Sequence, residues 1–441
     1  MPNIRELSTE AKLLYLKKNF NEALPLYKSI WAESNIKNEW DGLRLAVCFK
    51  HLKQYKQAIE ICNEVQRLFP SFDKINTTFA WCIYYTEIGI EQITDKQRLF
   101  LAGERIVKLS KQEDLSSNSE NKFPCVRSLS IFKILQYLNS NEHYIAKDIL
   151  YWTEKLNPNL LEVKPFKFNK NGKEREIAPQ KEQWYSLRAK AFYEDKQFNE
   201  CIEFANKALI TFKNFHYDNN LWFKRDIALS KAALGDIDTA LNILKEILTR
   251  KNEWFIQLEI AQIFNKRNNT DEALKYAILA VLNFGDSKMK IKLYQLLAEL
   301  LTKKGKKDIA KFHIELIYHI RKSNKWKIND ELNKLLKEYE INTNIDLNVN
   351  EILNKLKPHW EQLKVGNQES YKGIIRTMIS EGRAGFIDTE NKHSYYFSIK
   401  DFNGNNALAK QGQKVLFFLE DGYDKKKEQP TKIATNIRVD K

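Results

Sequence analysis

The feature that most constrains the fold of this chain is an internal repeat. Residues 11–30 read "AKLLYLKKNFNEALPLYKSI", and residues 46–65 read "AVCFKHLKQYKQAIEICNEV". In both segments a small residue is followed by leucine or an aromatic residue, then by an aromatic residue near a turn, and then by alanine. The offset of about 35 residues is typical of a repeated helix pair.

The same pattern returns further along the chain. Because a helix pair cannot bury its apolar stripe alone, pairs stack on one another, with small residues where two helices cross closely. Two looser units surround Ala80 and Ala146. The small residue of the second helix in the later units is Cys201, Ala240, Ala273 and Ala310.

These repeats resemble the tetratricopeptide repeat (TPR) family over residues 1–328. The resemblance implies an α-solenoid of about eight helix pairs whose groove binds a protein. The candidates for protein contact, taken from the repeat phase on the groove-facing helices, are Lys50, Lys190, Tyr193, Trp222 and Arg225.

Three departures from the repeat are expected. Alternating residues on both sides of Asn171-Gly172 predict a β-hairpin within residues 162–179, either an inert surface excursion or a basic prong. Residues 329–368 predict two helices that cap the last repeat, followed by a linker. Residues 369–441 form a separate domain in which strands replace helices.

The C-terminal domain has short β-branched and aromatic runs separated by polar turns. Five short strands in so small a domain favour a closed barrel, which leaves no exposed sheet edge. The predicted strands are Tyr371–Ser380, Ala384–Asp388, Ser394–Ile399, Lys414–Glu420 and Thr431–Val439.

Five motifs in this domain follow one another in the order of the cold-shock domains. They are Gly373, "GFI" (385–387), "YYFS" (395–398), "GQKVLF" (412–417) and "ATNI" (434–437). On these motifs residues 371–440 resemble a cold-shock domain, which is a barrel of the oligonucleotide-binding (OB) class. The predicted fold class is therefore mainly α, a TPR-like solenoid followed by a small five-stranded barrel.

The resemblance implies that the barrel binds RNA or another single-stranded nucleic acid by stacking bases on exposed aromatic rings. Strand alternation turns Phe386 and Tyr396 outward. The cations expected to meet phosphates on the barrel are Arg376, Arg383, Lys392 and Lys400.

The chain departs from the family pattern at several stacking positions. Where the family has an exposed Trp-Phe pair, this chain has Thr377-Met378. Ala384 replaces the first aromatic residue of the family's glycine-aromatic motif, and Ser398 replaces the histidine that follows its second aromatic motif. Each stack contributes about 1–3 kcal/mol. The barrel alone is therefore expected to bind weakly or not at all.

Charge elsewhere in the chain bears on this expectation. The formal net charge is +15, and basic residues are concentrated in residues 301–327, near the last repeat. This stretch is either a solvated helix face or a surface that shares phosphate contacts with the barrel. Its candidate nucleic-acid contacts are Lys303, Lys304, Lys307, Arg321 and Lys325.

Catalytic and metal-binding motifs are not found in the sequence. There is no phosphate-binding loop, no HExxH or GxSxG, and no CxxC among the five cysteines. We expect a protein without enzymatic activity, cofactor or metal. The first residues lack a secretion signal, and no apolar run is long enough to span a membrane, so we expect a cytoplasmic location and no membrane partner.

Two functions fit these observations. The first is an adaptor that binds single-stranded nucleic acid through the barrel and the basic repeats, while the TPR groove binds a protein. The second is a pure protein-interaction scaffold whose barrel no longer binds nucleic acid. Adaptors of this kind occur in bacterial defence and regulatory complexes, which is an analogy and not an observation on this chain.

Overall fold

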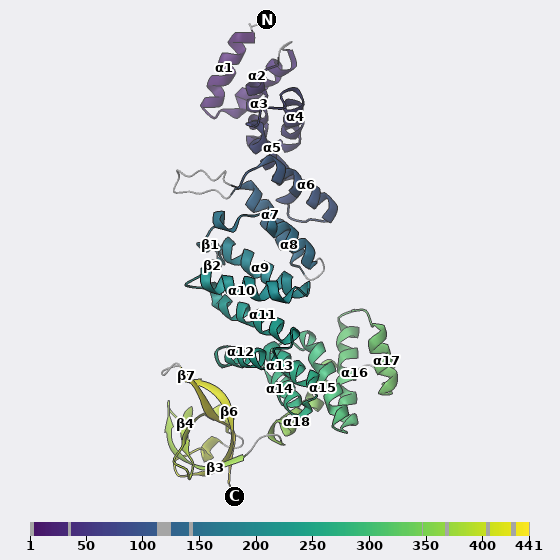
Figure 1. Ribbon diagram of the computed structural model, residues 1–441, viewed down its shortest axis with the longest axis vertical. Coiled ribbons are helices and arrows are strands. Elements are labelled where there is room, and N and C mark those ends of the chain that lie inside the picture. Colours follow the sequence, from purple (N-terminus) through teal and green to yellow (C-terminus); the bar gives the residue numbers. More distant parts are fainter. Residues whose placement is uncertain are drawn as a thin grey trace. The chain divides into compact units, whose positions relative to one another are not determined.

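The protein is mainly helical and ends in a five-stranded sheet (Figure 1). The computed structural model describes residues 4–33, 37–112, 125–140, 144–345, 347–366, 370–402, 406–424 and 429–440. By internal packing the chain divides into two compact units, Met1–Asp226 and Ile227–Lys441. No helix among the described residues has the length and apolarity needed to cross a membrane.

The first unit consists of helices that pack against their neighbours in sequence. A π-helical turn, η1 (Tyr84–Ile88), continues the fifth helix. A hairpin of β1 (Phe166–Lys170) and β2 (Lys173–Ile177) precedes the ninth. The helices are α1 (Ile4–Leu16), α2 (Phe20–Glu33), α3 (Glu39–His51), α4 (Tyr55–Leu68), α5 (Ile75–Ile83), α6 (Lys96–Leu109), α7 (Val126–Leu138), α8 (Ala146–Glu154), α9 (Gln180–Glu194) and α10 (Phe198–Thr211).

The small residues of the repeat lie where the sequence pattern places them. Ala11 and Ala46 in the first helix of a pair, and Ala23 and Ala58 in the second, are fully buried. A side chain no larger than a methyl group lets the backbones of crossing helices approach closely. The repeated alanine therefore reflects close helix packing, and it explains why the pairs stack in register.

The second unit, taken by itself, also begins with helices that pack against their neighbours in sequence. The helix α11 (Asn219–Ala233) contains the boundary between the two units. A short 3-10 helix, η4 (Ser287–Lys290), lies between two of the helices that follow. These are α12 (Ile237–Arg250), α13 (Trp254–Lys266), α14 (Thr270–Leu282), α15 (Ile291–Lys303), α16 (Lys307–Ser323), α17 (Asp330–Glu338) and α18 (Val349–Gly366).

The last helix, α18, does not stack as a further repeat. It packs against α14 and α16, the second helices of the two preceding pairs. The Trp360 indole N–H of α18 donates to His313 Nε2 of α16, at 2.9 Å, in a fully buried contact. The expected linker residues 367–369, which follow α18, lie outside the described residues.

Five strands follow α18 and close on themselves in the order β3-β4-β5-β7-β6. All neighbours are antiparallel except β5 and β7, which are parallel. The strands are β3 (Ser370–Ile379), β4 (Ala384–Asp388), β5 (Ser394–Ser398), β6 (Lys414–Asp424) and β7 (Gln429–Val439). Each begins or ends within a few residues of the predicted strand.

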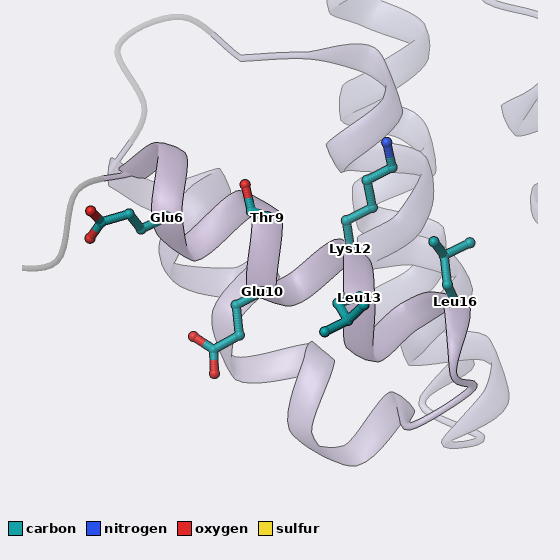
Figure 2. Close-up of a pocket in the computed structure, with 6 residues that line it drawn as sticks. All are labelled: Glu6, Thr9, Glu10, Lys12, Leu13 and Leu16. Atoms are coloured by element: carbon teal, nitrogen blue, oxygen red, sulfur yellow. The ribbon is translucent and has the colours of Figure 1, made fainter.

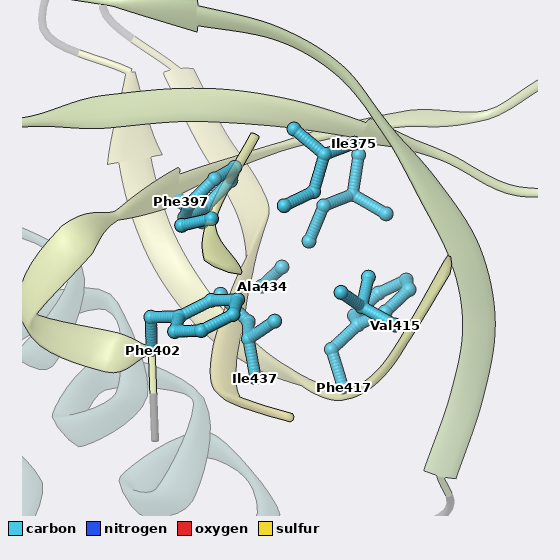
Figure 3. Close-up of a cluster of buried hydrophobic side chains, with 9 residues drawn as sticks. Ile375, Phe397, Phe402, Val415, Phe417, Ala434 and Ile437 are labelled. Atoms are coloured by element: carbon cyan, nitrogen blue, oxygen red, sulfur yellow. The ribbon is translucent and has the colours of Figure 1, made fainter. Parts of the chain in front are cut away.

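The interior of this barrel is an apolar cluster (Figure 3). Strand alternation sends every second side chain inward, so the inward residues of all five strands meet. Gly385 is required for this packing, because a Cβ there would lie 2.5 Å from the Phe397 ring and 2.7 Å from the Thr377 carbonyl oxygen. The labelled core residues are Ile375, Phe397, Phe402, Val415, Phe417, Ala434 and Ile437.

Candidate functional site

The candidate site on the barrel is an aromatic pair formed by neighbouring strands. Phe386 of β4 and Tyr396 of β5 lie directly opposite each other in the strand register. Their ring centroids are 5.8 Å apart and the rings meet edge to face, at 72°. Tyr396 is 41% exposed, whereas Phe386 is half-buried. The outward direction predicted for both side chains is present, and Tyr396 offers the more open ring.

Arg376 is positioned next to this pair by an irregularity in β3. The register between β3 and β4 shifts between Ile375 and Thr377, so Arg376 is the extra residue of a β-bulge. The bulge directs the guanidinium over the Phe386 ring, with 5.5 Å between Cζ and the ring centroid. The same group lies 3.5 Å from the Asp388 carboxylate. A cation therefore covers Phe386 and leaves Tyr396 as the available stacking surface.

The other predicted cations of the barrel lie in the turns around the pair. Arg383, between β3 and β4, donates to the Glu381 carboxylate and the Ser380 carbonyl. Lys392 lies in the turn between β4 and β5, at the opposite end of these strands. Lys400 is exposed and lies in the 3-10 turn that follows β5. The three residues therefore surround Tyr396 at two ends of the sheet and do not form one cluster.

The predicted basic stretch of the last repeat is divided by the structure. Lys303, Lys304 and Lys307 lie at the turn between α15 and α16, whereas Arg321 and Lys325 lie at the far end of α16. Because α16 has 17 residues, its two ends are separated by about 25 Å. The five residues therefore belong to two surfaces and not to one.

Two of the three charges at the first of these surfaces are paired with carboxylates within the protein. Lys303 Nζ lies 2.7 Å from the Glu299 carboxylate, and Lys304 forms an ion pair with Asp271. Lys307 Nζ lies 5.9 Å from the Tyr339 ring centroid. At the second surface, Arg321 donates to the Lys327 carbonyl at 2.8 Å.

The predicted protein-contact residues all belong to the first unit. Lys190 and Tyr193 share one face of α9, and Trp222 and Arg225 share one face of α11, because each pair is three residues apart. Lys190 Nζ donates to Asn139 Oδ1 at 3.2 Å and lies over the Tyr144 ring. Arg225 lies 3.8 Å from the Asp226 carboxylate.

Lys50 of α3 differs from the other protein-contact candidates because its amino group is largely enclosed. Burial lowers the pKa of Lys50, against a smaller opposing effect of the nearby Cys82 and Cys62 thiols. The cysteines that the structure describes, Cys48, Cys62, Cys82, Cys125 and Cys201, are all buried, and none of them forms a disulfide. Burial raises the pKa of the Cys48 thiol to about 12 and that of Cys82 to about 11, so both stay protonated.

Two further features fall outside the predicted residues. A shallow hollow on the outer side of α1 (Figure 2) is lined by Glu6, Thr9, Glu10, Lys12, Leu13 and Leu16. It is the face of a first helix that no earlier helix among the described residues covers.

Within the described ranges, no group of three or more His, Cys, Asp or Glu side chains could hold a metal ion.

Comparison with known proteins supports the repeat. Residues 42–71, which cover most of α3 and α4, match the family "Tetratricopeptide repeat". Residues 221–359 match "Domain of unknown function (DUF7017)". No curated protein matches the chain. The helical part is thus a TPR-like array.

Two solved structures are similar over most of the chain. One is a tetratricopeptide repeat protein from Parabacteroides merdae, with 10% identity and a TM-score of 0.30, covering 77% of this chain and 99% of the other. The other is a human IFIT1 dimer with PPP-AAAA, with 11% identity and a TM-score of 0.37, covering 82% of each chain.

Proposed function

We propose that this protein is a non-enzymatic cytoplasmic adaptor. Its C-terminal barrel, interpreted as a cold-shock-like OB domain, binds RNA or another single-stranded nucleic acid, while its TPR-like array binds a protein. The observation that carries the nucleic-acid part is the contact between Phe386 and Tyr396 on adjacent strands, with Arg376 directed onto Phe386. The buried cysteines, which form no disulfide among the described residues, support a reducing compartment.

The geometry of the pair suits a single base. A base stacked on Tyr396 would lie beside Phe386, which stands edge to face with Tyr396 and acts as a side wall. One stack contributes about 1–3 kcal/mol, and every base has a face that can stack, so this contact carries little sequence preference. Arg376 adds a positive charge beside the base. The barrel is thus a weak site that gains affinity when other contacts hold the same strand.

The protein-scaffold alternative is favoured by a different observation. Thr377, Met378, Ala384 and Ser398 occupy positions where cold-shock domains carry stacking or hydrogen-bonding side chains. In this chain Ala384 is buried and the Ser398 hydroxyl accepts from the Lys400 backbone N–H at 3.3 Å. Such a barrel fits a docking or structural module, with the TPR-like array as the only binding surface.

The test is the binding of short labelled single-stranded RNA and DNA to the full chain, measured by fluorescence anisotropy. At about 50 mM salt, the wild type is expected to bind, and Tyr396→Ala is expected to lower affinity by about tenfold to a hundredfold, which corresponds to one lost stack. The matched control is Tyr217→Ala, because Tyr217 is 69% exposed in the first unit and is not a candidate.

Two results would overturn the nucleic-acid part of the proposal. One is no detectable binding by the wild type at this low salt. The other is an equal effect of the Tyr396 and Tyr217 variants. Either result leaves the scaffold function, which is tested by identifying proteins that co-purify with the wild type and are lost on substitution of Lys190 and Trp222.

A further inference from the structure

The second unit has two edges made by the turns between helices. Within each helix pair the turns lie at one edge, and between successive pairs the connections lie at the other, because the two helices of a pair are antiparallel. We call these the intrapair edge (residues 234–236, 267–269 and 304–306) and the interpair edge (residues 250–254, 283–292 and 321–327). Asn283 Nδ2 donates to the Asn252 carbonyl at 3.0 Å, and η4 packs against α16, so the interpair connections are neighbours.

Two cations at the intrapair edge form ion pairs that cross between repeats. Arg267 lies 2.9 Å from the Asp238 carboxylate of the preceding pair. Lys304 pairs with Asp271 in the same way, whereas Lys303 pairs with Glu299 within α15. The two crossing pairs tie neighbouring repeats together and offset part of the positive charge at this edge, where Lys306 makes no ion pair with any described residue.

The interpair edge differs in charge. Its basic residues outnumber its carboxylates, which are Glu253 and Asp286. Lys288 is 3.3 Å from the Asp286 carboxylate. Four further cations make no ion pair within the part of the chain that the structure describes; they are Arg250, Lys292, Lys325 and Lys327.

The interpair edge also carries large apolar side chains in solvent. Phe284 is 95% exposed, Met289 is 61% exposed and Trp326 is 42% exposed. Trp326 stands between Lys325 and Lys327 in the sequence, and all three are exposed. Exposed aromatic residues next to unneutralised cations are the combination that single-stranded nucleic acids recognise, since rings receive bases and cations receive phosphates.

Phe284 is held at the tip of a rigid connection. Lys290, only 3% exposed, donates from Nζ to the carbonyl oxygens of Ala280, Val281 and Asn283, at 3.3, 3.2 and 2.5 Å. These bonds satisfy carbonyls at the end of α14 that no helical N–H reaches. A Cβ at Gly285 would lie 2.8 Å from Trp254, so the backbone beside Phe284 is packed against α13. The exposed position of Phe284 is therefore built into the loop.

We propose that the interpair edge of the second unit is a second contact for the nucleic-acid strand, with bases against Trp326 and Phe284 and phosphates at Lys325, Lys327 and Lys292. This inference rests on the proposed function, namely that the chain binds single-stranded nucleic acid. It assigns the phosphate contacts of the helical part to the interpair edge, and not to Lys303, Lys304 and Lys307. Packed helices lie about 8–10 Å apart. Phe284 follows α14 and Trp326 follows α16, two helices further on, so one short strand can reach both rings.

The experiment compares two charge reversals of equal size in the full chain. Lys325→Glu with Lys327→Glu changes the interpair edge, and Lys303→Glu with Lys304→Glu changes the intrapair edge. Affinity for short labelled single-stranded RNA is measured across a salt series. The interpair variant is expected to lose at least tenfold in affinity at low salt, and the slope of log affinity against log salt is expected to fall by about 1.4, for two lost phosphate contacts. The intrapair variant is expected to lose less than threefold.

A further double substitution tests the contribution of the aromatic rings to binding without changing the charge. Combined with Tyr396→Ala, it also distinguishes binding at the interpair edge from binding at the barrel site. Phe284→Ala with Trp326→Ala keeps the charge and is expected to weaken binding by tenfold or more, in the wild type and on the Tyr396→Ala background. Circular dichroism and thermal unfolding verify folding of each variant. If only Tyr396→Ala weakens binding, the proposed contact at the interpair edge is refuted and the proposed barrel site is supported. If only the interpair variants weaken binding, the proposed barrel site is refuted and the contact at the interpair edge is supported.

Two other outcomes overturn the proposal. One is an equal loss for the two charge reversals, which would mean that net charge alone decides binding. The other is that RNA does not bind, while vesicles of anionic phosphatidylglycerol sediment the wild type and not the Phe284→Ala, Trp326→Ala variant. The interpair edge would then contact lipid, because exposed Phe, Met and Trp among lysines also suit an anionic membrane surface.

Discussion

Acid is expected to weaken the attachment of α18, and the contact responsible is the one between His313 and Trp360. His313 is fully buried, its Nε2 accepts the indole N–H of Trp360, and its Nδ1 lies 2.9 Å from the Ile309 carbonyl. A neutral ring protonated at Nδ1 satisfies both contacts, whereas a charged ring would turn a second N–H toward the indole donor. Burial lowers the pKa of His313 from 6.5 to about 4.

The size of the effect follows from this shift. Between pH 6.5 and pH 4 the unfolded chain binds a proton that the folded chain excludes, so the free energy of unfolding falls as pH drops through this window. Well above pH 6.5 the His313 ring is neutral in both the folded and the unfolded chain, so it does not change the free energy of unfolding with pH. At about 1.36 kcal/mol for each pKa unit, the loss reaches about 3 kcal/mol below pH 4.

The measurement is urea unfolding of the wild type and His313→Gln at a series of pH values from neutral to acid. The variant cannot titrate at this position, so its stability should fall less steeply with acid than that of the wild type, by about 3 kcal/mol over the window. His393→Gln is the matched control, because His393 is an exposed histidine of the same unit. Parallel curves for the wild type and His313→Gln would refute the reasoning.

Three other substitutions test the packing described above. Gly385→Ala should destabilise the barrel by about 1–3 kcal/mol, since a Cβ would meet the Phe397 ring and a backbone oxygen; thermal unfolding with no change would contradict this. Glu182→Ala should cost about 1–3 kcal/mol, because this carboxylate, 1% exposed, accepts the His216 backbone N–H; urea unfolding measures the loss, and Glu182→Gln should recover part of it. Lys364→Ala breaks the 2.7 Å ion pair with Glu420 between α18 and β6 and should cost no more than about 1 kcal/mol; a larger loss in the same assay would mean that this contact dominates the docking of the barrel.

The sequence predicted those parts of the fold that depend on local periodicity. The repeated alanines predicted helix crossings, and Ala11, Ala46 and Ala58 are fully buried. Alternation predicted the strand bounds and the outward direction of Tyr396, because side chains of a strand alternate between faces. The prediction that the chain is mainly helical, with TPR-like repeats and a five-stranded C-terminal sheet, is confirmed.

The remaining features depend on contacts between distant residues. A bulge is not visible in the pattern of β3, so the orientation of Arg376 over Phe386 could not be predicted. Lys304 and Arg321 are close in sequence, but a helix places them at opposite ends. Phe284 carries an apolar side chain that periodicity would bury, and the bonds of Lys290 together with the packing of Gly285 against Trp254 explain its exposure. Whether these residues bind nucleic acid stays a prediction.

The closure of the barrel has a consequence for its motions. Strands β5 and β7 are joined by a single register pair, Tyr396 with Ile433, and by the isolated bridge of Phe402 with Ile437. The barrel therefore has one seam with few backbone hydrogen bonds, and Tyr396 lies on it. Local opening is easiest where such bonds are few, so amide exchange should be fastest along this seam. A ligand that stacks on Tyr396 would then also stabilise the pairing of β5 with β7, and its binding would slow the opening of the whole barrel.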